Sequence, residues 1–323
     1  MSVIPAGIHP NHITATNAVF NMVLYMFAMY AGYRIHNGVH VSMNNDRLYV
    51  ILLCCGAMTY MGMVLDCLDG MVARARKQTS KTGEFLDHWC DAINTPLITS
   101  GISFVLRFTG MESALVIISI SGLYCAQLLT QNIRKDFVAV AGVEGQLLTT
   151  ICYIIACFTV NLPESHYLVY YVAKLMFAVG FCASVIPIFF FVKDFRWREM
   201  AYLALFLYTQ AMISYLYIDM SYLAYSWLAC VNALSMNGQI VFLNVITNQV
   251  PRQLVTSSAL YAALCMSILC CIQTYAKSDL QHESIGALKP YVYGIMLIMY
   301  SMNASETLLQ VVRYFNNNKR RVQ

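Results

Sequence analysis

Residues 66–91 read DCLDGMVARARKQTSKTGEFLDHWCD and follow an apolar run. Four aspartates stand in this stretch: Asp66 and Asp69 are three residues apart, and Asp87 and Asp91 are four residues apart. If both segments are helical, each pair of carboxylates lies on one face of its own helix. Two such faces turned toward each other would form a cage of oxygen atoms. The spacing therefore predicts a pair of opposed helices that share an acidic site.

The four carboxylates imply a bound cation. Carboxylates that converge in a small volume repel one another unless a positive charge neutralises them. Hard divalent ions such as Mg²⁺ and Mn²⁺ prefer oxygen ligands. Acidic groups beside membrane-length apolar segments are costly, and they are usually functional rather than solvated loop charges. We therefore expect the four aspartates to be ligands of Mg²⁺ or Mn²⁺.

The composition of the whole chain is that of a membrane protein. Of the 323 residues, 59% are hydrophobic and 11% are charged, and the mean hydropathy is +0.58. A helix needs roughly 20 apolar residues to cross about 30 Å of hydrocarbon. We therefore expect an all-α polytopic membrane protein with about ten transmembrane helices. Their expected ranges are Asn11–Ile35, Leu48–Leu68, Phe85–Phe108, Ser113–Ile133, Gly145–Val160, Tyr167–Val192, Met200–Tyr217, Tyr222–Val245, Leu254–Tyr275 and Tyr291–Tyr314.

The Lys and Arg residues predict the orientation of these helices, because cytoplasmic loops are enriched in both. With ten spans, one side of the membrane holds the loop between Asp69 and Asp87, which we call the motif loop. The basic residues on that side are Arg74, Arg76, Lys77, Lys81, Arg134, Lys135, Lys193, Arg196, Arg198, Arg252, Arg313, Lys319, Arg320 and Arg321. The other side receives Arg34, Arg47, Arg107, Lys277 and Lys289, and Lys174 falls inside a helix. This asymmetry predicts that the motif and both termini lie in the cytoplasm. The net charge of +4 then reflects topology, and no basic tract interleaved with aromatic residues indicates a nucleic-acid partner.

Three stretches of the sequence resemble a known family. The eight fixed positions of residues 66–91 follow D-x2-D-G-x2-A-R-x8-G-x3-D-x3-D, which is similar to the signature of the CDP-alcohol phosphotransferase family. Residues 10–14, PNHIT, resemble the entry to the first helix of that family. Residues 87–91, DHWCD, resemble DHGCD of the eukaryotic choline/ethanolamine phosphotransferase branch, with Trp89 as a large side chain near the site in place of glycine. Residues 142–146, GVEGQ, resemble a Gly-x-x-Glu-x-Gln stretch of the same branch.

The resemblance implies phosphoryl transfer from a CDP-alcohol with the help of two metal ions. The implied metal ligands are Asp66, Asp69, Asp87 and Asp91. The implied contacts to the CDP-alcohol are Asn11, Asp66, Gly70, Ala73, Arg74 and Gly83. The two glycines would let the substrate approach the backbone, and the guanidinium would suit a phosphate, although it could instead pair with an aspartate. At the first helix, Asn11 or Thr14 would cap the helix, and Asn21 is a further possible nucleotide contact.

The base that removes the proton of the acceptor hydroxyl stays open between two residues. Asp91 could serve if it binds metal only loosely, as the resemblance to the wider family implies. His88 lies between Asp87 and Asp91, and an imidazole suits a base at neutral pH. Glu144 could orient His88, or it could be an exposed acid that the helix dipole favours. We favour His88 assisted by Glu144 as the catalytic pair.

The expected activity is transfer of phosphocholine or phosphoethanolamine from CDP-choline or CDP-ethanolamine to diacylglycerol in the lipid bilayer. CMP would be released and phosphatidylcholine or phosphatidylethanolamine formed. Alternatives are another acceptor or donor (alkyl-acyl glycerol, ceramide, or CDP-diacylglycerol with inositol) and, in another class, an ion-coupled transporter. The resemblance also implies a homodimer in the endoplasmic reticulum or Golgi, with its active site facing the cytoplasm.

The chain offers no sign of a division into separate domains. No long polar or Gly/Ser-rich linker interrupts it, so we expect a single membrane domain over residues 1–323. Within that domain, residues 10–195 would form the catalytic core, and residues 196–323 would add further transmembrane helices.

Overall fold

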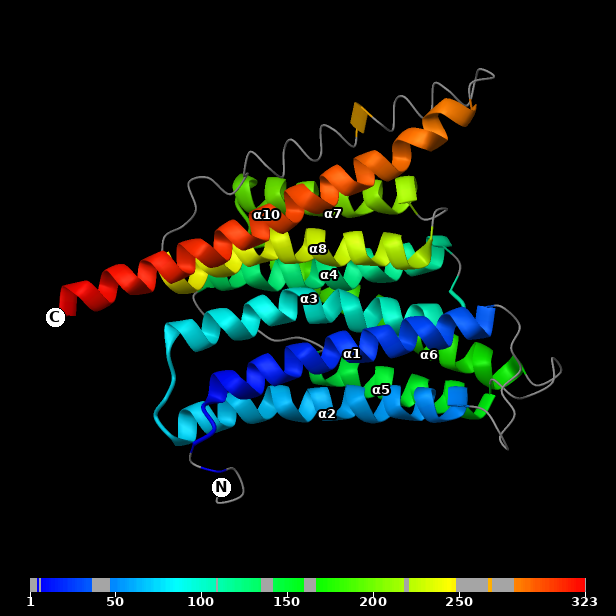
Figure 1. Cartoon of the computed structure of the whole chain (residues 1–323), viewed down its shortest axis with the longest axis horizontal. Coiled ribbons are helices and arrows are strands. Elements are labelled where there is room, and N and C mark those ends of the chain that lie inside the picture. The colour runs from blue at the N-terminus through cyan, green and yellow to red at the C-terminus, as the bar shows by residue number, and fades with distance from the viewer. Residues whose placement is uncertain are drawn as a thin grey trace. The chain divides into compact units, whose positions relative to one another are not determined.

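The computed structural model describes Pro5 and residues 7–36, 47–108, 110–134, 142–159, 167–217, 221–247, 267–268 and 282–322. Within these ranges the chain is helical and contains no strand (Figure 1). The helices are α1 (Pro10–His36), α2 (Arg47–Ala75), α3 (Lys81–Val105), α4 (Gly110–Arg134), α5 (Gly142–Thr159), α6 (Tyr167–Val192), α7 (Trp197–Tyr217), α8 (Tyr222–Val241), the π-helical segment η2 (Phe242–Thr247) and α10 (His282–Val322). The expected all-α fold is confirmed for this part of the chain. The helix expected at Leu254–Tyr275 lies outside the described residues except for 267–268.

Several of these helices have the length and hydropathy of membrane spans. Five in the described ranges meet both requirements: Pro10–His36, Arg47–Ala75, Gly110–Gln131, Tyr222–Val245 and Pro290–Tyr314. Large apolar side chains also lie on the surface, with Phe189 70% and Trp197 74% exposed. Hydrocarbon tails accept such side chains as readily as a protein core does. The chain is therefore a helical membrane protein, whereas the count of ten spans and the cytoplasmic position of the termini stay predictions.

The chain forms two compact units. The first comprises Met1–Ile120 and Ala139–Pro187, and the second comprises Ser121–Val138 and Ile188–Gln323. The divisions fall within α4 and within α6, so each unit receives a part of both helices. The expected single domain, with a core over residues 10–195, stays a prediction. The acidic stretch of residues 66–91 lies wholly in the first unit.

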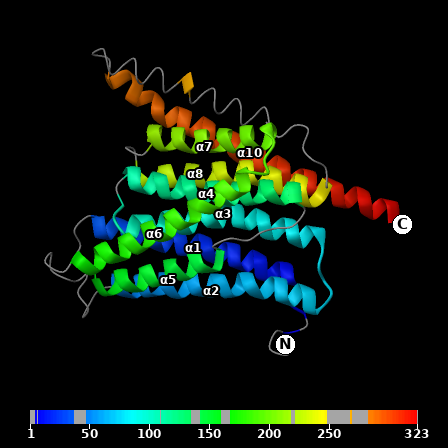
Figure 2. The ribbon, with the colours of Figure 1, turned by 180° about the vertical axis from the view of Figure 1, so that it is seen from behind.

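In the first unit, α1 packs against both α2 and α3, and α2 packs against α5. Figures 1 and 2 show α1 between α2 and α3, with α1 and α2 running in opposite directions. Two glycines permit close packing of α1 and α3. A Cβ atom on Gly101 would lie 3.0 Å from the Cβ atom of Ala28, and one on Gly32 would overlap the ring of Phe104. The start of α1, the end of α2 and the start of α3 thereby meet at one end of this unit.

The turn between α2 and α3 fixes the two halves of the acidic stretch. Lys77 has a φ of 54°, in the left-handed region, which is typical of the residue that follows a helix end. The Gln78 N–H donates to the Ala73 carbonyl at 2.8 Å and closes this turn. At the start of α3, the Ser80 hydroxyl accepts the Gly83 N–H at 3.1 Å and caps the helix. The aspartates of α2 and α3 are therefore held by two defined helix ends.

Arg76 ties the segment before α1 to the same turn. Its guanidinium donates to the Ile8 carbonyl at 2.7 Å and to the Pro5 carbonyl at 3.2 Å. Arg76 lies one residue beyond the end of α2. The entry to α1 is thus attached to the exit from α2, beside the acidic residues.

Candidate metal and substrate site

Three of the four aspartates converge between α2 and α3. Asp66 on α2 and Asp87 and Asp91 on α3 each offer a carboxylate oxygen, and these oxygens lie within 4.8 Å of one another. The three side chains are half-buried. None of them forms an ion pair with a Lys, Arg or His side chain in the part of the chain that the structure describes. Negative charges at this separation repel one another strongly in a poorly hydrated site, so the cluster has the chemistry of a divalent cation site.

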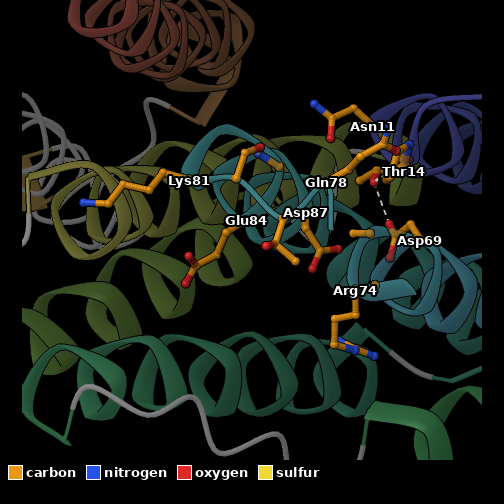
Figure 3. A pocket seen from close by; sticks show the side chains of 14 residues that line it. Asn11, Thr14, Asp69, Arg74, Gln78, Lys81, Glu84 and Asp87 are labelled. Atoms are coloured by element: carbon orange, nitrogen blue, oxygen red, sulfur yellow. Dashed lines mark hydrogen bonds between the residues drawn. The ribbon is translucent and has the colours of Figure 1, made fainter. Parts of the chain in front are cut away.

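Asp69 occupies a different position from the other three. It is buried, and its Oδ2 atom accepts a hydrogen bond from the Thr14 hydroxyl at 2.5 Å. Figure 3 shows Asp69 and Asp87 projecting from different helices toward the same space. Asp69 therefore connects α1 to the acidic site. Its expected role as a metal ligand stays a prediction.

A pocket of about 490 Å³ opens beside these carboxylates. It is formed by the start of α1, the end of α2, the turn and the start of α3 (Figure 3). Its lining residues are Pro10, Asn11, Thr14, Asp69, Gly70, Ala73, Arg74, Gln78, Thr79, Ser80, Lys81, Gly83, Glu84 and Asp87. Every residue expected to contact the CDP-alcohol is among them except Asp66. A pocket of this size is large enough for a nucleotide-sized ligand.

Both glycines of the pocket sit where a side chain would collide with a neighbour. A Cβ atom on Gly83 would lie 3.1 Å from the Asn11 Oδ1 atom and 3.3 Å from the Ser80 Oγ atom. A Cβ atom on Gly70 would lie 3.2 Å from the Arg74 Nη1 atom. A side chain at either glycine would therefore require the amide of Asn11 or the guanidinium of Arg74 to shift by a few tenths of an ångström.

Arg74 was expected either to contact phosphate or to pair with an aspartate. It lines the pocket, and within the described ranges no acidic side chain lies within 4.0 Å of its guanidinium nitrogens. An unpaired guanidinium presents two parallel N–H groups that match a phosphate. Its contact to a phosphate stays a prediction.

His88 and Glu144 lie in different environments. His88 is buried on α3 and, at about 100° per residue, is rotated by about 100° from Asp87 and about 60° from Asp91 around the helix axis. It is not a lining residue of the pocket. Glu144 is exposed in the first turn of α5. No hydrogen bond or ion pair joins the two among the contacts of the described residues, so their catalytic roles stay predictions.

Trp89 packs against a neighbour on its own helix, and its expected place near the site stays a prediction. Its ring stacks on that of Phe85, with centroids 6.4 Å apart and an angle of 25° between the planes. Because Trp89 is two residues from Asp87, about 200° of helical rotation separate them. The indole therefore faces the opposite side of α3, and it does not line the pocket.

Sequence reasoning missed the polar contacts of α1. The Thr14 hydroxyl, expected to cap the helix, donates to Asp69. The Asn17 amide donates to Asp66 Oδ1 at 3.5 Å. Asn21, expected to be a possible nucleotide contact, is buried and donates to Asn17 Oδ1 at 3.1 Å. The sequence contains a pattern that indicates one polar helix face, because the three residues recur at intervals of three and four along an apolar segment.

Comparison with known proteins agrees with this arrangement. Cholinephosphotransferase 1 of Danio rerio is 25% identical over 162 residues, which are 48% of this chain and 40% of that relative. The matched region thus spans well under two thirds of the relative's length. Residues 7–186 match the family described as CDP-alcohol phosphatidyltransferase, and this range contains the acidic stretch and every residue of the pocket. Because the family match covers more than half of the sequence, the chain belongs to the CDP-alcohol phosphatidyltransferase family.

Proposed function

We propose that this protein transfers phosphocholine or phosphoethanolamine from CDP-choline or CDP-ethanolamine to diacylglycerol, with release of CMP. The observation that carries the proposal is the convergence of Asp66, Asp87 and Asp91 beside the pocket that the other signature residues line. Membership in the family supports a CDP-linked substrate. The similarity to a cholinephosphotransferase supports phosphocholine as the transferred group.

The donor set fits Mg²⁺ or Mn²⁺. Ionised carboxylates accept hydrogen bonds and donate none, so they cannot bond one another. Three carboxylates with oxygens within 4.8 Å of one another are stabilised by a hard cation. Asp66, Asp87 and Asp91 would hold two such ions together with Asp69. When bound, the ions would neutralise the diphosphate and stabilise the leaving CMP.

The pocket residues would bind and orient the donor. Arg74 would clamp a phosphate through two N–H groups. Gly70 and Gly83 would let the diphosphate or the cytidine lie against the backbone. Asn11 would offer an amide to the nucleotide. Orientation of the diphosphate in line with the acceptor hydroxyl is the main contribution that a protein can make to phosphoryl transfer.

Removal of the acceptor proton is assigned to His88, with Asp91 as the alternative. His88 follows Asp87 directly in α3 and lies on the flank of the carboxylate face. A base there would take the proton as the hydroxyl attacks. If Glu144 orients His88, the Glu144 side chain must reach the imidazole from the first turn of α5. Glu144→Gln should then lower kcat, as His88→Ala does.

The membrane location suits a reaction between a water-soluble donor and a lipid. The pocket is formed by helix ends rather than by helix centres, which supports a position near the bilayer surface. The enrichment of Lys and Arg on the motif side supports a cytoplasmic active site. The endoplasmic reticulum or Golgi is proposed from the family resemblance alone.

A headgroup assay tests this proposal. Purified protein in nanodiscs that contain diacylglycerol is incubated with Mn²⁺ or Mg²⁺ and with labelled CDP-choline or CDP-ethanolamine, and CMP and labelled lipid are quantified. We expect equal amounts of CMP and new phospholipid. Turnover only with ceramide or alkyl-acyl glycerol, or only with CDP-diacylglycerol and inositol, would instead assign one of those reactions. Ion flux in vesicles without nucleotide turnover would assign a transporter.

A further inference from the structure

A row of polar residues on α1 lies opposite the acidic residues of α2. Thr14, Asn17 and Asn21 are buried, with exposed fractions of 6%, 3% and 2%. Opposite them on the antiparallel helix α2 lie Asp69, Asp66 and Gly62, at matching intervals in reverse order. These six residues, which we call the α1–α2 polar ladder, form three rungs along a helix interface that is otherwise apolar.

Two of the three rungs have a hydrogen bond between the helices. The Thr14 hydroxyl donates to Asp69 Oδ2 at 2.5 Å (Figure 3), and the Asn17 amide donates to Asp66 Oδ1 at 3.5 Å. The third rung supports the second, because the Asn21 amide donates to Asn17 Oδ1 at 3.1 Å.

Gly62 makes room for both amides of the ladder. A Cβ atom on this glycine would lie 3.1 Å from the Asn21 Oδ1 atom and 3.2 Å from the Asn17 Oδ1 atom. These distances are shorter than ordinary van der Waals contact, so a larger residue would push the amides aside. Gly62 therefore provides the space that the amides of the α1–α2 polar ladder occupy.

The contacts determine how the carboxylates are presented. A carboxylate that accepts a hydrogen bond at one oxygen has a fixed rotation, and its other oxygen is left for a cation. Asn21 engages the oxygen of the Asn17 amide, so the Asn17 NH₂ group is directed toward Asp66. Hydrogen-bond partners of this kind orient metal ligands in many proteins, and their removal typically lowers metal affinity by about 10–100-fold.

We propose that Thr14, Asn17 and Asn21 are positioning residues that preorganise Asp69 and Asp66 for divalent metal binding. This inference rests on the proposed function, because it takes the two aspartates as metal ligands. The competing explanation is that the ladder only holds α1 against α2. Hydrogen bonds between membrane helices contribute about 0.6 kcal/mol on average, and a packing role alone would leave metal affinity unchanged.

The test measures Mn²⁺ affinity without nucleotide or lipid acceptor. Electron paramagnetic resonance of free Mn²⁺ gives the Kd of the protein in nanodiscs. Thr14→Val removes the hydroxyl and keeps the shape, whereas Thr14→Ser keeps the hydroxyl. Thr16→Val is the matched control, since Thr16 is exposed on the same helix and its hydroxyl donates to the His12 carbonyl. Asn21→Leu tests the third rung.

We expect Thr14→Val to raise the Kd for Mn²⁺ by about 10–100-fold, and Thr14→Ser and Thr16→Val to stay near the wild-type value. Asn21→Leu should raise the Kd less than Thr14→Val, because it acts through Asn17. If wild-type protein binds Mn²⁺ and Thr14→Val binds it equally well, the positioning role is wrong and the proposed function stands. If wild-type protein binds no Mn²⁺, the metal chemistry of the proposed function fails, and the positioning role with it.

Discussion

Polar side chains meet between helices in both units of this protein, and the two places differ in the charge of those groups. In the first unit, α2 and α3, which both pack against α1, bring together the carboxylates of Asp66, Asp87 and Asp91. In the second unit, α8 meets α7 and α10 through neutral amides and hydroxyls. The Asn232 amide donates to the Thr209 hydroxyl at 3.1 Å, and the Asn303 amide donates to the Ser235 hydroxyl at 2.6 Å.

The neutral interface forms hydrogen bonds among its own groups, although several buried amide atoms of its described residues, among them Asn232 Oδ1 and both side-chain polar atoms of Asn237, have no hydrogen-bond partner. An amide both donates and accepts hydrogen bonds, so two helices can bond each other without an ion; Gln239, for example, donates to Asn303 Oδ1 at 2.5 Å. Ionised carboxylates accept hydrogen bonds but donate none. Three carboxylates that face one another therefore need a cation from outside the chain. We interpret the α7–α8–α10 contacts as packing and the α2–α3 contacts as a site. Substitutions at the two interfaces should therefore affect different measurements.

The largest expected effect is that of Asp87→Asn. The amide has nearly the same shape as the carboxylate but lacks the charge that a divalent cation requires, so we expect kcat/KM to fall by about 10³-fold or more. Asp194→Asn in the second unit is the matched control. Asp194 is exposed and paired with Arg134, whose Nε–H donates to it at 2.8 Å, and such surface pairs contribute about 0–1 kcal/mol. Equal activity of Asp87→Asn and wild-type protein would contradict the metal site.

A second comparison separates base from ligand within the acidic interface. His88→Ala should lower kcat by about 10²-fold, the lower range for general-base catalysis, and added Mn²⁺ should not restore it. Asp91→Asn should be restored at least partly by high Mn²⁺, because loss of a ligand weakens binding by mass action. The measurement is kcat as a function of Mn²⁺ concentration. The reverse pattern would assign the base to Asp91 and exclude His88.

A smaller effect is expected at the pocket wall. A Cβ atom at Gly83 would lie 3.1 Å from the Asn11 Oδ1 atom, so the Asn11 amide would have to shift by a few tenths of an ångström in Gly83→Ala. If this shift costs the one hydrogen bond of the amide to the nucleotide, about 1 kcal/mol, the KM for the CDP-alcohol should rise by about fivefold. Gly294→Ala in α10 is the control, since a Cβ atom there meets nothing within 4 Å. An unchanged KM for Gly83→Ala would remove Asn11 from the donor site.

Local periodicity explains what the sequence could predict. The intervals between the aspartates depend only on helix geometry, and they place Asp87 and Asp91 on one face of α3 as expected. Apolar length likewise predicts helix bounds, so that the expected Tyr167–Val192 coincides with α6. The same geometry applies to Trp89, whose position two residues from Asp87 turns it by about 200° around the helix axis.

The contacts between helices could not be predicted in this way. Thr14 meets Asp69, and Asn17 meets Asp66, because α1 and α2 pack with a particular axial register. That register depends on side chains along the whole interface, including Gly62, rather than on the residues that meet. The division of the chain into two units, within α4 and within α6, also depends on contacts between distant segments. A single sequence records none of these pairings directly.

The smallest expected effect, that of Asn303→Leu, lies at the neutral interface. Leucine removes the hydrogen bonds of Asn303 with Ser235 and Gln239 but retains the bulk of the side chain. Measured hydrogen bonds between membrane helices average about 0.6 kcal/mol and reach about 1.7 kcal/mol, so the loss of two should lower the free energy of unfolding by about 1–3 kcal/mol. Thermal unfolding in nanodiscs measures this loss, with Met302→Leu, an exposed neighbour on α10, as the control. The Kd for Mn²⁺ should stay at the wild-type value. A tenfold weaker Mn²⁺ affinity in Asn303→Leu would show that the two interfaces are energetically coupled, and the division into a packing interface and a binding interface would then be wrong.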